Sequence, residues 1–181
     1  MDILSHGLWA GLALAALMPR AQPTRRTVSA TIALAVLPDL LQLLPVAFDA
    51  LVRGQGWAML WQYATALPGQ EPLLSPPRAS LAHHLHCVGH SALVAGLVTA
   101  AIGFWTGRFW WPLTGWWLHI LTDVFTHSAE FFPSPVFYPL TYWGFDGIAW
   151  NTPWFMALNY AALAVFAVWL WRRRSRAQGR H

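Results

Sequence analysis

The 181-residue chain has no lysine, one cysteine and few charged residues of either sign. Charged residues make up 10% of the sequence, whereas a soluble domain carries roughly 25%, so a water-soluble globule is excluded. The single cysteine, Cys87, excludes a disulfide within the chain. Five of the eleven arginines follow Trp171, directly after an apolar segment. That position is typical of a membrane topology signal, and we expect no nucleic-acid partner.

In place of charge, the sequence has long apolar stretches, with 56% hydrophobic residues and 13 tryptophans. A helix needs about 20 apolar residues to cross the hydrocarbon core of a bilayer. Five segments approach this length, so we expect a single-domain, all-α polytopic membrane bundle of about five transmembrane helices. The expected spans are residues 3–18, 27–44, 80–105, 109–128 and 153–171. The aromatic segment Trp57–Ala64 predicts an additional interfacial helix.

The distribution of arginine predicts the orientation of the chain in the membrane. With the N-terminus outside, only Arg53 and Arg78 lie in outer segments. The other nine arginines lie in inner segments: Arg20, Arg25, Arg26, Arg108, Arg172, Arg173, Arg174, Arg176 and Arg180. Because arginine accumulates on the cytoplasmic side, the C-terminus should be cytoplasmic. The two long connections, residues 45–79 and 129–152, should lie outside, where a binding site is expected.

Two acidic residues lie inside the expected spans, Asp39 in residues 27–44 and Asp123 in residues 109–128. A carboxylate in hydrocarbon costs at least about 2.5–3.5 kcal/mol, so such a residue indicates a functional site. Three histidines, His6, His90 and His119, lie at a comparable depth when each helical residue is counted as about 1.5 Å. The arginine-based orientation places all five groups in the outer half of the membrane.

The spacing of these residues predicts a metal site. His119 and Asp123 are four residues apart and share one face of a helix, and His86 and His90 repeat this spacing. Histidine and aspartate ligands without thiolate suit zinc, and also manganese or iron. We therefore predict one or two divalent ions, zinc first, held by His6, Asp39, His90, His119 and Asp123. Further candidate ligands are His86, His127 and Asp146.

Such a site predicts hydrolysis. A metal-bound water loses its proton near neutral pH and can attack phosphorus or a carbonyl carbon. We expect the five ligands to be catalytic and the substrate to be a membrane lipid or another amphiphile with a phosphoester or other ester bond. Arg78 or Arg53 would hold an anionic headgroup. The segments Trp57–Ala64 and Phe131–Tyr138 would flank the entrance to the site.

At these motifs the chain resembles the bacterial membrane-bound, metal-dependent hydrolases that include a LexA-regulated inner-membrane protein. The resemblance is carried by Ser5-His6-Gly7-Leu8, Leu37-Pro38-Asp39-Leu40, His90-Ser91, Leu118–Asp123, Thr126-His127-Ser128, Phe145-Asp146-Gly147 and Asn159-Tyr160. It implies a metal-dependent hydrolase of the bacterial inner membrane, with the site facing the periplasm in the orientation above. A His-Arg step of many members is absent, since this chain has His84-Leu85-His86 there. A more distant similarity to zinc-dependent phospholipases C and single-strand nucleases implies phosphoester chemistry.

Two other functions fit parts of the pattern. Gly89-His90 and His119-x-x-x-Asp123 imitate motifs of phosphatidic-acid-type lipid phosphatases. Those enzymes need an arginine six residues before the second histidine, where this chain has Leu113, and a lysine, which it lacks. The alternative that stays open is a non-enzymatic structural or assembly factor, or a metal-binding protein, whose histidines and aspartates hold the bundle together. Metal content after purification separates this alternative from a hydrolase.

Overall fold

The computed structural model describes residues 1–18, 23–67 and 69–178, so Arg20 and Arg180 of the arginine count lie outside the described residues. Within them the chain forms seven helices and no β-strand, which confirms the predicted all-α class. The helices are α1 (Ile3–Leu17), α2 (Arg25–Val52), α3 (Gly56–Thr65), α4 (Pro76–Gly89), α5 (Ala92–Thr106), α6 (Leu113–Thr126) and α7 (Pro153–Gln178). The helix expected at Trp57–Ala64 is α3.

Three helices begin at residues whose side chains cap them. Asp2, Thr24 and Ser91 each have an extended backbone and accept a hydrogen bond from the main-chain nitrogen three residues later. These bonds satisfy one of the free N–H groups at each helix start. Ser91 therefore starts α5 one residue after His90, the C-cap of α4, and the two helices are bent by 57° at this point.

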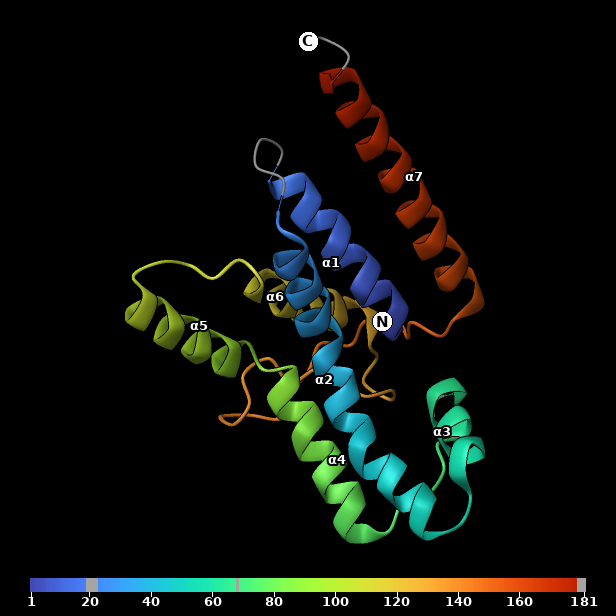
Figure 1. Ribbon diagram of the computed structural model, residues 1–181. Helices are drawn as coiled ribbons and strands as arrows, with labels where there is room; N and C mark the ends of the chain where they lie inside the picture. Colours follow the sequence, from blue (N-terminus) through green and yellow to red (C-terminus); the bar gives the residue numbers. More distant parts are fainter. Residues whose placement is uncertain (19–22, 68, 179–181) are drawn as a thin grey trace.

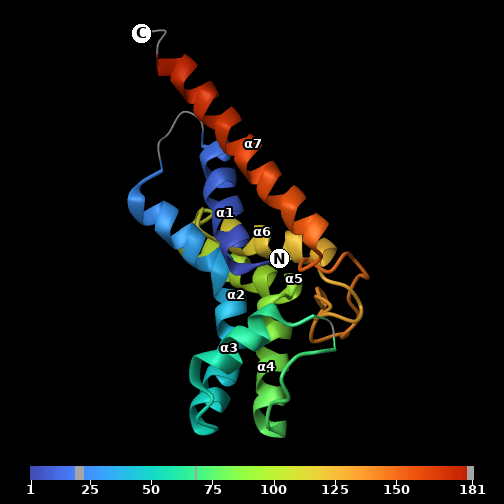
Figure 2. The same cartoon turned by 90° about the vertical axis from the view of Figure 1, so that its right-hand side faces the viewer.

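Helix α2 is the centre of the fold and packs against α1, α3, α4 and α6 (Figures 1 and 2). Two glycines allow its neighbours to approach closely. A Cβ atom on Gly115 of α6 would meet the backbone of Thr31, and one on Gly89 of α4 would lie 2.9 Å from the Cβ of Pro38. Small residues at such contacts let helix backbones come together. The close approaches at Gly115 and Gly89 bring the polar residues of α4 and α6 near the middle of α2.

The number of membrane spans is smaller than the predicted five. By length and composition α2 and α7 can cross a membrane, and the bent pair α4 and α5 would make a third span. Helices α1 and α6 contain 15 and 14 residues, so each is only about 21–23 Å long against a hydrocarbon core of about 30 Å. The expected fourth span was too long because residues 109–112 precede α6, which begins at Leu113.

Helix α2 is also longer than predicted. It continues through Pro38 and Pro45 to Val52, whereas the expected span ended at Leu44. Asp39 is therefore thirteen residues, about 20 Å, from the end of the helix, rather than five.

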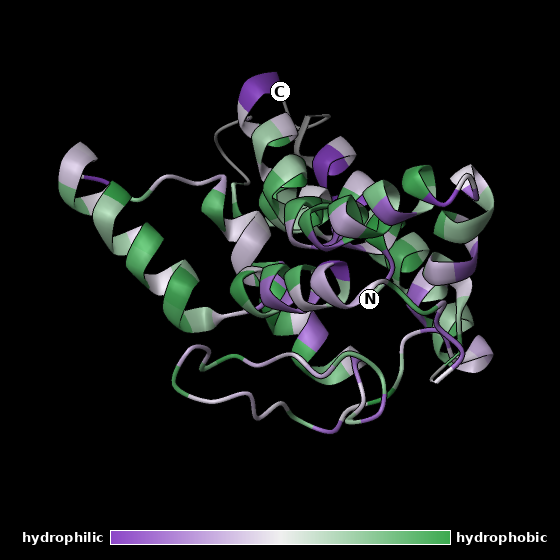
Figure 3. Cartoon of the chain, turned by 90° about the horizontal axis from the view of Figure 1, so that it is seen from below, coloured by the Kyte–Doolittle hydropathy of each residue, from purple (hydrophilic) through white to green (hydrophobic). Residues whose placement is uncertain are grey.

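Apolar side chains cover the outer surfaces of several helices. Figure 3 shows hydrophobic residues along α5, which projects from the rest of the fold. Phe104 and Trp105 near its end are 86% and 81% exposed, and on α7 Val165 and Trp171 are 70% and 67% exposed. Exposed apolar residues of this size and number suit a lipid environment rather than water.

Candidate metal centre

The predicted ligands come together from four helices. His6 lies on α1, Asp39 on α2, His90 at the C-terminal end of α4, and His119 and Asp123 on α6. All are buried except Asp39, whose side chain is 15% exposed. One ligand atom from each of His6, Asp39, His119 and Asp123 lies within 4.8 Å of the others, so this group could hold a metal ion.

Asp123 is the centre of the cluster. The Nε2 atoms of His6 and His90 each lie 3.0 Å from its carboxylate. The Nε2 atoms of His119 and His127 each lie 3.3 Å from it. Asp39 is farther away, 3.8 to 3.9 Å from the nearest imidazole nitrogens. The structure thus adds His127, a further candidate in the sequence, to the side chains around Asp123.

Backbone carbonyl groups orient three of the imidazole rings. A carbonyl oxygen can only accept a hydrogen bond, so the Nδ1 atom that faces it carries the proton and the neutral ring presents an unprotonated Nε2. This arrangement is characteristic of histidines that bind metals. The pairs are His90 with His86 (2.8 Å), His119 with Ala35 (2.7 Å) and His127 with Phe132 (2.8 Å).

Two of the inward-facing atoms lack a hydrogen-bond partner, and two others face each other. The Nε2 atoms of His90 and His119 are 3.0 Å apart, although neither carries a proton in this tautomer. The Nε2 of His6 and the Oδ2 of Asp39 are buried without any hydrogen-bond partner. The amino group of Met1 donates to Asp123 at 2.5 Å but leaves these atoms unsatisfied. Buried acceptors that face one another are costly unless a cation lies between them.

The distances fit a zinc-type ion. Zinc binds imidazole nitrogen at about 2.0–2.1 Å, so two tetrahedral ligands lie about 3.3 Å apart. The spacings of 3.0 to 3.3 Å around Asp123 are close to this value. The residue types and their geometry thus both fit a divalent metal.

The start of α1 is held by a polar network that sequence analysis did not connect with the site. Asp2 accepts hydrogen bonds from Ser5 and from the hydroxyl of Tyr160 on α7, at 2.9 Å for the latter. Asn159, also on α7, donates to the Ser5 hydroxyl at 2.7 Å. This network holds the first turn of α1, and the His6 ring itself contacts Thr122 Oγ1 through Nδ1 at 3.4 Å.

His86 and Asp146 lie outside the ligand group. The ring nitrogens of His86 face Gln42 Oε1 at 3.0 Å and the carbonyl of Pro133 at 3.2 Å, and only its main-chain carbonyl contacts His90 Nδ1. Asp146 accepts a hydrogen bond from the main-chain nitrogen of Ala129 at 2.8 Å and holds the loop after α6.

Arg53 and Arg78, the residues predicted to hold an anionic headgroup, share one carboxylate. Both form ion pairs with Asp49, the first through Nε at 2.9 Å and the second at 2.5 Å, and Ser75 donates to the same carboxylate. Within the part of the chain that the structure describes, neither arginine pairs with Asp39 or Asp123. Asp49 was overlooked because the expected span ended before it, although Asp49 and Arg53 are four residues apart.

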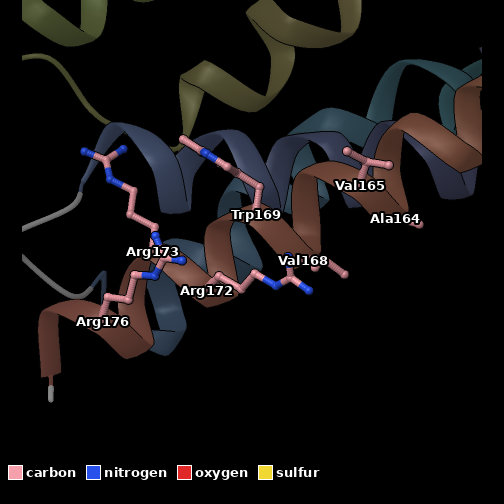
Figure 4. A pocket seen from close by; sticks show the side chains of 7 residues that line it. All are labelled: Ala164, Val165, Val168, Trp169, Arg172, Arg173 and Arg176. Atoms are coloured by element: carbon pink, nitrogen blue, oxygen red, sulfur yellow. The ribbon is translucent and has the colours of Figure 1, made fainter.

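A cavity of about 310 Å³ opens onto the cluster at Asp39 and His127. Both segments expected at the entrance contribute to its wall, α3 with Tyr63 and Ala64, and the loop after α6 with Phe131 and Phe132. A larger groove of about 840 Å³ runs along α7 (Figure 4). It is lined by residues of α7 alone and reaches none of the cluster, so the smaller cavity gives access to the site.

Comparisons with protein-family models, curated proteins and solved structures give no match for this chain. The resemblance to membrane-bound hydrolases therefore rests on the short motifs alone. Any functional conclusion comes from the side chains of the site and their geometry.

Proposed function

We propose that the protein is a membrane-embedded, metal-dependent hydrolase that cleaves a phosphoester or another ester of a lipid or similar amphiphile. The observation that carries this proposal is the convergence of imidazole Nε2 atoms and two carboxylates beside a largely apolar cavity. A divalent ion at this point would activate water near neutral pH and polarise the ester. Zinc suits the ligand set best, and the resemblance to membrane-bound hydrolases points to the same chemistry.

The residues of the cluster have different proposed roles according to their positions. His6, His119 and Asp123 are buried and would hold the ion, with His90 beside Asp123 as a further ligand. Asp39 is half-buried and lines the cavity, and its buried Oδ2 has no hydrogen-bond partner. It is therefore the residue placed to orient an attacking water and to accept its proton.

We further propose that the protein lies in the bacterial inner membrane with the N-terminus and the site outward. Single cysteines at Gln70 and Ser175, in a Cys87→Ala background, test this orientation. An impermeant thiol reagent should label residue 70 and not residue 175 in intact cells. Labelling at residue 175 would overturn the orientation.

A hydrolysis assay with matched variants tests the function. Purified protein is stripped with a chelator, reloaded with zinc and offered a panel of phospholipid, polyprenyl-phosphate and carboxylic-ester substrates. We expect turnover only after reloading, its loss in His119→Ala, and its retention in His83→Ala, a histidine outside the cluster. Full turnover by metal-free protein, or a trapped covalent enzyme intermediate, would contradict the proposal. Metal-loaded protein that cleaves nothing in the panel would favour a non-enzymatic metal-binding protein, and protein that takes up no metal would favour the structural or assembly alternative.

A further inference from the structure

The C-terminal end of α7 carries positive charge that the acidic residues of the chain do not balance. Four arginines lie in its last turns: Arg172, Arg173, Arg174 and Arg176. None of the chain's seven acidic residues lies between positions 3 and 38 or after position 146. Among the described arginines, the two that form ion pairs with a carboxylate, Arg53 and Arg78, lie near the other end of the fold at Asp49. The charge on α7 is therefore left for groups outside the chain to balance.

The four arginines of α7 have different surroundings. Arg174 donates from Nη2 to the carbonyl of Ala15 at 2.9 Å, so it joins α7 to the end of α1. The other three line the groove of about 840 Å³ along α7 (Figure 4). Among these, the guanidinium of Arg173 lies 5.5 Å from the ring centre of Trp169, a cation–π contact that restricts its position. Three guanidinium groups are thus gathered along one groove.

The groove extends from the expected membrane surface into the hydrocarbon. By length and composition α7 can cross a membrane, and Arg172 lies about 29 Å along the helix from Pro153, close to the hydrocarbon thickness of about 30 Å. The arginines therefore lie at the level of the lipid phosphates. Val168 and Val165, one and two turns earlier, also line the groove and lie at the level of the acyl chains. The groove is charged at one end and apolar at the other.

We propose that this groove is a binding site for an anionic phospholipid of the surrounding bilayer. Arg172, Arg173 and Arg176 hold its phosphate through charge-assisted hydrogen bonds, and the valines contact one acyl chain. A zwitterionic lipid fits less well, because its ammonium group would lie among three guanidinium groups. A soluble phosphate would leave the apolar end uncovered, so the ligand is a lipid. The groove reaches none of the metal cluster, and this lipid is not the substrate proposed above.

Binding of two phospholipids with the same acyl chains tests the charge requirement. Protein delipidated in neutral detergent is titrated with phosphatidylglycerol or phosphatidylcholine, and bound lipid is counted by native mass spectrometry. Phosphatidylglycerol should bind at least about tenfold more tightly, because each arginine near the membrane surface attracts anionic lipid. Equal binding of the two lipids would overturn the proposal. Glycerol phosphate at the same excess should not displace the lipid, and displacement would contradict a site that recognises the acyl chain.

Two variants with the same loss of charge separate the groove from the general charge of the surface. Arg172→Gln/Arg176→Gln removes two arginines that line the groove, and Arg25→Gln/Arg26→Gln removes two exposed arginines at the start of α2. The first should weaken phosphatidylglycerol binding on the order of tenfold, and the second should change it far less. Thermal midpoints in detergent check that both variants are folded. If both weaken binding equally, general surface charge explains the affinity and the proposal fails.

A pair of tryptophan variants tests the groove without changing the charge. Trp169→Ala should weaken phosphatidylglycerol binding several-fold, because Arg173 loses its aromatic partner and the groove loses part of its wall. Trp171→Ala should leave binding unchanged, since Trp171 is exposed on the same helix but does not line the groove. Unchanged binding in Trp169→Ala, or an equal loss in both variants, would contradict the site. His119→Ala should bind the lipid as the wild type does, so a failure of the hydrolase function leaves this site intact.

Discussion

Asp49 and Asp123 are both fully buried, yet their surroundings are opposite. Asp49 is surrounded by donors: two guanidinium groups and the hydroxyl and main-chain nitrogen of Ser75. Asp123 is surrounded by four imidazole Nε2 atoms, three of which belong to rings whose proton is on the other nitrogen. The first carboxylate is satisfied by the chain itself. The second accepts a hydrogen bond from the amino group of Met1, but it lies beside His6 Nε2 and Asp39 Oδ2, two acceptors that an added cation would satisfy.

This difference separates a structural ion pair from a binding site. The Asp49 group joins the end of α2 to the start of α4 and needs nothing from outside the chain. The Asp123 group leaves His6 Nε2 and Asp39 Oδ2 without partners. A buried carboxylate alone therefore does not indicate function, and the chemistry of its neighbours decides between the two interpretations.

The largest expected effect is that of Asp123→Ala on metal content. Wild-type protein should carry about one or two zinc ions per chain, and the variant close to none, because the central ligand is lost. Elemental analysis of detergent-purified protein measures both, and hydrolysis should fall in parallel. Equal metal content in the two proteins would show that Asp123 is not a ligand.

A smaller effect, on stability rather than on metal, is expected from Asp49→Asn. The neutral amide pairs less well with Arg53 and Arg78, so the thermal midpoint should fall by on the order of 5 °C. Zinc content per folded chain should stay at the wild-type value. If this variant loses its metal as Asp123→Ala does, the two carboxylates do not play the separate roles assigned to them.

The smallest effect is expected from Cys87→Ala. The thiol is buried and lies 3.6 Å from His83, outside the cluster. Metal content should be unchanged and most of the activity retained, because neither metal binding nor the proposed attack by water needs a thiol. A loss of more than about tenfold in turnover, with metal retained, would assign Cys87 a role in the reaction.

The residues of the His/Asp cluster could be predicted from the sequence because their chemistry conflicts with their surroundings. Asp39 and Asp123 interrupt apolar segments, and the four-residue spacing of His119 and Asp123 places both on one helix face. Contacts between distant segments could not be predicted from the sequence. Examples are the hydrogen bonds between the Ala35 carbonyl and His119 and between the Gln42 amide and Tyr63. These pairings depend on how closely the helices approach.

The span count was wrong for a related reason. Hydropathy shows that α1 and α6 are apolar but not that they end before crossing the bilayer. It also does not show that the backbone breaks between His90 and Ala92. The expected span also ended at Leu44, whereas α2 continues through Pro45 to Val52.

X-ray absorption at the zinc edge of the purified protein tests the central claim most directly. We predict a shell of nitrogen and oxygen atoms at about 2.0–2.1 Å, with the outer scattering of several imidazole rings and no sulfur. Asp123→Ala should lose this signal and Asp49→Asn should keep it. A protein that takes up no zinc on supplementation, or a sulfur shell at about 2.3 Å, would contradict the metal centre described above.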